Sequence, residues 1–135
     1  MLNGSSDCLK PCREWLDQRE HERAARLVRE QDREHYVLSH GSLRAVLSRY
    51  LGVGPDSIRF DRSPSGKPML AMGLWGQSGI TFNLSHAHSR ALVAVSRAQE
   101  VGVDLELVRS DIQVEQLSRR FFAAREHTVI MQSAE

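Results

Sequence analysis

Three apolar segments follow one another in the second half of the chain, and they constrain the fold more than any other feature. They cover residues 80–84, 91–95 and 101–108, with a short turn between each pair. Side chains of a β-strand alternate between two faces, and short turns join antiparallel neighbours. The sequence therefore predicts a three-stranded antiparallel meander.

Helices are expected before and after these strands in the sequence. Apolar residues between positions 43 and 51 recur at helical spacing, and Gly52 stands where a helix commonly ends. Ser39 is predicted to cap the start of this helix. The charge-rich residues 13–38 predict a surface helix with a break near residues 29–33, and residues 111–122 predict another helix.

The remaining segments complete an α+β fold in which helices pack on an antiparallel sheet. Residues 57–60 predict a short strand, and residues 61–79, which are rich in Gly and Pro, predict a long loop. Residues 1–12 are expected to form a loop-like N-terminal tail, and residues 13–135 a single α+β domain.

Composition excludes several classes of function. The chain has 18 Lys and Arg against 17 Asp and Glu, so it lacks the basic balance of a nucleic-acid-binding domain. No apolar run reaches the roughly 18 residues of a membrane span, and no secretory signal is evident. Cys8 and Cys12 have no neighbouring ligands at zinc spacing. A reduced, cytoplasmic protein is expected, with no nucleic-acid or membrane partner.

Two carboxylates stand two positions apart inside the third apolar segment. In a strand, Asp104 and Glu106 would point together off the face opposite the valines and leucines. A shared cation would relieve the repulsion between them, and carboxylate oxygens suit Mg²⁺. The alternative is an exposed strand face that happens to be acidic.

Two further short motifs carry polar chemistry. Gly66-Lys67-Pro68 lies in the long loop, where Lys67 could meet a phosphate as a point charge, although a plain turn is the alternative. Ser85 and His86 end a strand and could hydrogen-bond an anionic oxygen, the alternative for the histidine being simple solvent exposure. No Gly-x-Ser-x-Gly elbow surrounds Ser85, which disfavours a hydrolase nucleophile.

The order of these motifs resembles that of the surfactin-type 4′-phosphopantetheinyl transferases. Gly-Lys-Pro, Phe-Asn-Leu-Ser-His, Gly-Val-Asp-Leu-Glu and Arg-Phe-Phe follow one another between Arg44 and about Glu126. The resemblance implies transfer of the phosphopantetheine arm of coenzyme A to a serine of an acyl, peptidyl or aryl carrier protein. It also implies one half of a pseudo-dimeric α+β fold, with the active site between the halves.

The resemblance also implies roles for individual residues. Asp104 and Glu106 would be Mg²⁺ ligands, Lys67 with Gly66 and Pro68 would lie against the adenosine portion of coenzyme A, and Ser85 and His86 would contact its phosphates. Arg44 is a further expected coenzyme A contact. His35 stands where the family has an arginine for the 3′-phosphate, with Arg23, Arg26 and Arg33 as weaker candidates. His86 is the general-base candidate for catalysis.

The family's Trp-x-x-Lys-Glu signature is not found in this sequence. The two tryptophans, Trp15 and Trp75, are followed by other residues. The chain is therefore expected to be the N-terminal half of such an enzyme with the second half missing. Two alternatives remain: a catalytically incomplete half that binds coenzyme A or a carrier protein, or that self-associates through the face left by the missing half, and a plain interaction domain.

Overall fold

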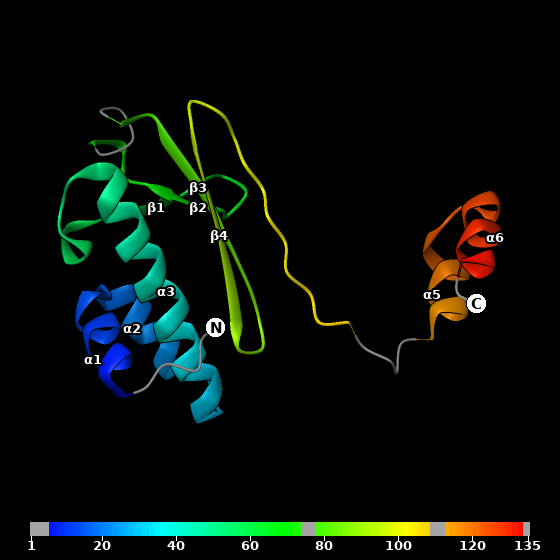
Figure 1. Cartoon of the computed structure of the whole chain (residues 1–135), viewed down its shortest axis with the longest axis horizontal. Coiled ribbons are helices and arrows are strands. Elements are labelled where there is room, and N and C mark those ends of the chain that lie inside the picture. The colour runs from blue at the N-terminus through cyan, green and yellow to red at the C-terminus, as the bar shows by residue number, and fades with distance from the viewer. Residues whose placement is uncertain (1–5, 74–77, 109–112, 134–135) are drawn as a thin grey trace.

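The computed structural model describes residues 6–73, 78–108 and 113–133, and it confirms the α+β class. The elements in chain order are α1 (Ser6–Trp15), α2 (Gln18–Ala25), α3 (Glu30–Leu51), the short 3₁₀ helix η1 (Pro55–Ser57), β1 (Phe60–Arg62), β2 (Pro68–Leu70), β3 (Ile80–Ala87), β4 (Arg90–Arg97), α5 (Val114–Phe121) and α6 (Ala124–Gln132). The long helix α3 lies between α1 and α2 on one side and the strands on the other (Figure 1).

Helix α3 confirms the predicted helix but begins much earlier than expected. It ends as predicted, because Gly52 adopts a left-handed φ of 68° and its N–H bonds to the carbonyl of Ser48 at 2.9 Å. Ser39 is not a cap: it lies buried inside the helix and donates its hydroxyl to the carbonyl of Tyr36 at 3.0 Å. The helix starts at Glu30, so the predicted break lies slightly earlier in the chain, at residues 26–29.

The expected loop-like N-terminal stretch is wrong for residues 6–12, which belong to helix α1. Pro11 lies inside this helix and disfavours it locally. Packing against α3 compensates, because Cys12 is buried in the first hydrophobic cluster. Gly41 of α3 is the contact point: a Cβ placed there would lie 2.7 Å from the Cα of Cys12.

Replacing Gly41 by alanine is expected to lower the free energy of unfolding by about 1–3 kcal/mol or more, as overpacking of a core does. The clash is with Cβ, Sγ and Cα of Cys12, and because Cβ and Cα cannot rotate away, the two helices must move apart. Urea denaturation measures the change. Gly102→Ala is the matched control, because no atom lies within 4 Å of a Cβ added there, and an equal loss in both variants would contradict the close helix contact.

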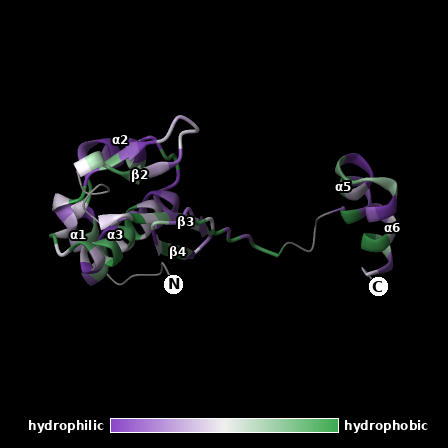
Figure 2. Ribbon diagram, turned by 90° about the horizontal axis from the view of Figure 1, so that it is seen from above, coloured by the Kyte–Doolittle hydropathy of each residue, from purple (hydrophilic) through white to green (hydrophobic). Residues whose placement is uncertain are grey.

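Two hydrophobic clusters form the core. The first joins α1, α2 and the first half of α3, and its buried members are Cys12, Leu16, Ala24, Tyr36, Val37 and Leu38. The second joins the end of α3 to the strands, and its buried members are Leu43, Leu47, Ile58, Leu70, Ile80 and Phe82. Helix α2 is largely hydrophilic (Figure 2), so it contributes polar side chains beside this core.

The predicted long loop contains a small hairpin. Strand β1 pairs antiparallel with β2, with Phe60 opposite Leu70. The short strand expected at residues 57–60 is therefore misplaced, because Pro55 begins η1 and the strand starts only at Phe60. The second hairpin confirms the strands predicted around residues 80–84 and 91–95, with Ile80 opposite Arg97 and Ala87 opposite Arg90.

The prediction of a third strand in the meander is wrong. Residues 101–108 have no strand assignment. The N–H of Val103 bonds to Oδ1 of Asn83 at 2.9 Å, and the N–H of Leu105 bonds to Oγ of Ser85 at 3.0 Å. Side chains of β3 thus take the place of the backbone ladder that a strand would need.

Two short helices follow this segment. Helix α5 begins at Val114, later than predicted, and residues 109–112 lie outside the described part of the chain. Helix α6 had no sequence prediction; Oγ of Ser118 contacts Nδ1 of His127 at 2.8 Å and joins the two helices. No helix in the described ranges is both long and apolar enough to cross a membrane.

Candidate functional site

A cleft of about 980 Å³ opens between α2, the start of α3, the β1–β2 hairpin and β3. Its walls carry basic side chains from all of these elements and the β3–β4 turn: Arg19, Arg23, Arg29, Arg62, His35, His40, His86 and His88. The carboxylates on the same walls are Asp17, Glu20, Asp32 and Asp61. Asp17 and Glu20 pair with Arg44, which leaves the four arginines of the walls against two carboxylates, Asp32 and Asp61. Such a surface suits a ligand with several negative charges.

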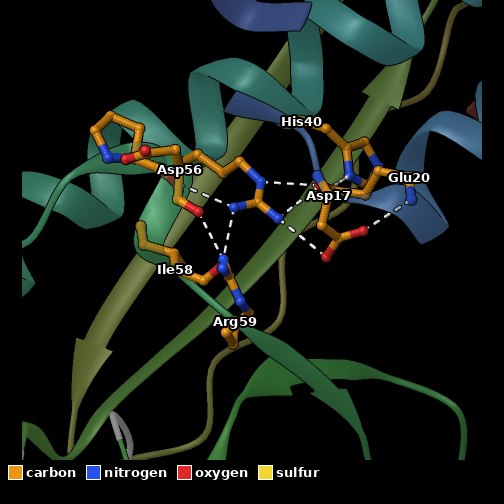
Figure 3. Close-up of polar contacts among 8 residues, drawn as sticks. Asp17, Glu20, His40, Asp56, Ile58 and Arg59 are labelled. Atoms are coloured by element: carbon orange, nitrogen blue, oxygen red, sulfur yellow. Dashed lines mark hydrogen bonds and ion pairs between the residues drawn. The ribbon is translucent and has the colours of Figure 1, made fainter. Parts of the chain in front are cut away.

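A buried ion network supports the base of this cleft. The guanidinium of Arg44, 0% exposed, donates from Nε to Oε2 of Glu20 at 2.9 Å and from Nη2 to Oδ2 of Asp17 at 3.1 Å. Its Nη1 donates to the carbonyls of Pro55 and Ile58 at 3.0 and 2.9 Å. Figure 3 shows Asp17 and Glu20 on one side of this network and Ile58 on the other.

Glu20 is the anionic centre of the network. Burial by itself raises the pKa of this carboxyl, but hydrogen bonds from His40, Arg44 and the Asp17 N–H outweigh burial and lower the pKa to about 2. The Asp17 side chain and Glu20 also form the capping box that starts α2. The network therefore anchors α2, together with Arg19 and Arg23, against α3.

Arg44 was expected to contact coenzyme A, and its geometry favours a structural role instead. All three of its guanidinium nitrogens already face acceptors within the chain. A ligand contact would require breaking this buried set, which is costly for charged groups. We therefore leave Arg44 out of the proposed ligand-binding surface.

Strand β3 places Ser85 and His86 on opposite faces of the sheet, because successive residues of a strand alternate. His86 lines the cleft together with Phe82 and Leu84 of the same face, and Asn83 of the other face also reaches the cleft. Its pKa is lowered, first by loss of solvation at the cleft wall and then by the positive charges of His40 and His35. A neutral imidazole is therefore favoured, and a bound anion would raise its pKa again.

The Gly66-Lys67-Pro68 turn connects the β1–β2 hairpin to the acidic segment. Gly66 has a φ of 83°, which favours glycine. Nζ of Lys67 forms an ion pair with Glu100 at 2.8 Å and donates to the carbonyl of Val101 at 3.0 Å. Of the three residues, Pro68 lines the cleft. Lys67 thus tethers the residues just before Asp104.

Asp104 and Glu106 are both exposed, on a segment that runs beside β3. Oδ1 of Asp104 accepts from Oγ of Ser85 at 3.0 Å and from the N–H of Leu105 at 2.9 Å. Within the described residues, no group of three or more His, Cys, Asp or Glu side chains could hold a metal ion. Two carboxylates nevertheless fit Mg²⁺, which commonly takes one or two carboxylates together with waters and substrate phosphates.

The site residues named from the sequence therefore fall into two places. His86, Pro68 and His35 line the cleft. Ser85 contacts Asp104, and Lys67 contacts Glu100 and Val101 just before it in the chain. The sequence missed the network of Asp17, Glu20 and Arg44, although the Asp-x-x-Glu spacing of a capping box was visible at positions 17 and 20.

Comparison with known proteins adds independent information. A family model described as 4′-phosphopantetheinyl transferase, N-terminal, matches residues 4–98. The 4′-phosphopantetheinyl transferase HetI of Nostoc sp. strain PCC 7120 is 39% identical over 108 residues, which cover 80% of this chain and 45% of HetI. The Synechocystis protein slr0495, whose name assigns the same activity provisionally, is 31% identical over 115 residues, with coverages of 82% and 44%.

A more distant relative comes from mouse. Its L-aminoadipate-semialdehyde dehydrogenase-phosphopantetheinyl transferase is 29% identical over 99 residues, which cover 68% of this chain and 32% of the mouse protein. The chain thus spans less than half the length of each of these relatives. The family-model match includes Lys67, Ser85 and His86 but ends before Asp104 and Glu106.

Proposed function

Because this chain belongs to the 4′-phosphopantetheinyl transferase family, we propose that it supplies the coenzyme A-binding part of such a transferase. The reaction moves the phosphopantetheine arm of coenzyme A to a serine of an acyl, peptidyl or aryl carrier protein, with Mg²⁺. The observation that carries this proposal is the cleft, which gathers four arginines and four histidines on one concave surface. Coenzyme A carries a 3′-phosphate and a pyrophosphate, and clustered cations favour such an anion.

The two places of the site suit the two charged parts of coenzyme A. Arg23, His35 and His86 line the cleft and would hold phosphate oxygens by charge-assisted hydrogen bonds. Asp104 and Glu106 would hold Mg²⁺ beside the pyrophosphate. When bound, Mg²⁺ neutralises charge on phosphate oxygens and helps to orient them for attack.

The residues of this chain would mainly bind and orient. Attack of the carrier serine on the β-phosphate requires the two reacting groups to be held in line. His86 has the neutral imidazole that a general base needs. It lies on the face of β3 opposite the Ser85–Asp104 contact, so we assign it to phosphate binding and not to proton transfer.

The second candidate is binding of coenzyme A or a carrier protein without transfer. It rests on the same cleft, whose basic side chains would bind an anion whether or not transfer follows. Incubating the chain with coenzyme A, Mg²⁺ and an apo carrier protein separates the two. A mass gain of one arm on the carrier serine supports transfer, whereas coenzyme A binding without a mass gain supports the second candidate.

Replacing Arg23 by methionine is expected to weaken coenzyme A binding about tenfold, because hydrogen bonds to charged groups contribute about 1.5–3 kcal/mol. Methionine keeps much of the side chain's length and removes its charge. Isothermal titration calorimetry at fixed salt measures the affinity. Arg26 is the matched control: it is an exposed arginine of the same region that does not line the cleft.

Arg26→Met should bind coenzyme A within about twofold of the parent protein, since it changes net charge by the same amount without touching the cleft. An equal weakening in both variants would indicate only general electrostatic attraction. No binding of coenzyme A by the parent chain would refute the proposed function.

A further inference from the structure

The segment that carries Asp104 is held by side chains of one face of β3. Thr81 donates its hydroxyl to the carbonyl of Gln99. Two and four residues further along the strand, Asn83 accepts the N–H of Val103 at 2.9 Å and Ser85 accepts the N–H of Leu105 at 3.0 Å. Positions 81, 83 and 85 share a face because strand side chains repeat every two residues. This polar row fixes where the segment lies.

Ser85 has a second contact that the other two residues of the row lack. Its hydroxyl donates to Oδ1 of Asp104 at 3.0 Å while its oxygen accepts the Leu105 N–H. A serine hydroxyl has a single hydrogen to donate. While Ser85 donates that hydrogen to Asp104, it cannot donate to a phosphate oxygen. A phosphate contact is the role that the family resemblance implies for Ser85.

The same contacts orient the Asp104 carboxylate. Oδ1 receives both the Ser85 hydroxyl and the Leu105 N–H, at 3.0 and 2.9 Å. The described contacts of this side chain therefore fall on one oxygen, and Oδ2 remains for a cation. Hydrogen bonds to a ligating carboxylate commonly set its orientation and tune metal affinity.

We infer that Ser85 is a positioning residue that acts through Asp104 and holds this carboxylate in place for a divalent cation. The inference rests on the proposed function, because it takes Asp104 as a Mg²⁺ ligand. It differs from a direct phosphate contact in one measurable respect: Ser85 should affect metal binding and leave metal-free coenzyme A binding unchanged.

Ser85→Ala is expected to weaken Mn²⁺ binding about tenfold, the lower end of the usual effect of losing a hydrogen-bond partner of a metal ligand. Mn²⁺ is the probe because it shares the oxygen ligands of Mg²⁺ and its free concentration can be followed by electron paramagnetic resonance. Titrations are run with coenzyme A present.

Ser85→Thr keeps the hydroxyl and should bind Mn²⁺ within about twofold of the parent protein. Ser96→Ala, on β4, controls for a serine-to-alanine change in the hairpin.

Two further readouts separate positioning from other roles. With a chelator present to remove divalent metal, Ser85→Ala and the parent chain should bind coenzyme A with equal affinity. A lower affinity of Ser85→Ala under this condition would show a direct ligand contact and overturn the inference. Amide exchange by NMR should be faster at Leu105 in Ser85→Ala and unchanged in Ser85→Thr. Unchanged exchange at Leu105 would show that the bond from its N–H to Oδ1 of Asp104 holds without Ser85, and would also overturn the inference without reference to metal.

Failure of the inference is distinguishable from failure of the proposed function. If Asp104→Ala abolishes Mn²⁺ binding and Ser85→Ala leaves it intact, the positioning role is wrong and the metal site stands. If the parent chain binds coenzyme A but no Mn²⁺ under any condition, the metal site and the role of Ser85 both fall. If coenzyme A does not bind either, the proposed function falls with them.

Discussion

Replacing Arg44 by methionine is expected to lower the free energy of unfolding by about 3–5 kcal/mol, the usual effect of removing one partner from a buried ion pair. The Glu20 side chain is only 9% exposed. The substitution therefore leaves a nearly buried carboxylate without its arginine partner. It also removes the guanidinium from which the carbonyl of Pro55 accepts at 3.0 Å. Urea denaturation at neutral pH, followed by circular dichroism, measures the loss.

Arg49→Met is the matched control for this prediction. Arg49 is an exposed arginine in the last turn of the same helix. Its loss should change stability by no more than about 1 kcal/mol, the scale of a cation near a helix C-terminus. Similar losses in both variants would contradict a special role for the network.

The pH dependence of stability provides a second readout of the same prediction. The pKa of Glu20 is lowered from 4.5 to about 2 in the folded chain. Its contribution is therefore present above the unfolded pKa and is lost as the pH falls from about 4.5 toward 2. In Arg44→Met the carboxyl loses hydrogen bonds that lower its pKa, so this part of the acid dependence should shrink.

The parts of the fold that local patterns determine could be predicted from the sequence. The helix ending at Leu51 followed from apolar spacing and Gly52, and the β3–β4 hairpin followed from two alternating segments around a short turn. The cap predicted at Ser39 was wrong because serine, although favoured at caps, also occurs inside helices. There its hydroxyl can donate to a carbonyl three residues back.

Contacts between distant residues explain what the sequence did not reveal. Residues 101–108 have the alternation of a strand, yet Asn83 and Ser85 take the N–H groups that would build a ladder. Arg44 meets Glu20 across 24 positions of the chain. Neither pairing leaves a local pattern, because each depends on how α2, α3 and β3 are placed in space.

The candidate site also divides into residues that short motifs indicated and residues that only the fold brings together. The short motifs pointed to Lys67, Ser85 and Asp104. In the structure, Lys67 contacts Glu100 and Val101, and Ser85 contacts Asp104 a few residues further along the same segment. The parity of the strand also implied that Ser85 and His86 point to opposite faces, which a motif match alone does not consider. The remaining cleft residues come from α2, α3 and the β1–β2 hairpin, so their convergence required the fold.

Replacing Asp104 by asparagine is expected to remove most of the metal dependence of coenzyme A binding. Asparagine keeps the shape of the side chain and an oxygen that can accept from Ser85, but it removes the charge that would attract Mg²⁺. In the parent chain Mg²⁺ should strengthen coenzyme A binding, and in Asp104→Asn the affinities with Mg²⁺ and with chelator should be equal. For a protein that performs the transfer, the rate should fall about 10²-fold or more, as when a charge-stabilising group is removed.

Asp56→Asn is the matched control, because Asp56 is exposed on η1 and lies outside both the cleft and the acidic segment. It should leave coenzyme A binding and its Mg²⁺ dependence unchanged. Glu106→Gln should share the loss seen in Asp104→Asn if the two carboxylates hold one ion. A normal Mg²⁺ effect in Asp104→Asn would favour the other interpretation of this segment, an acidic surface without a bound cation. The comparison thus decides whether like charges two residues apart mark a metal site here.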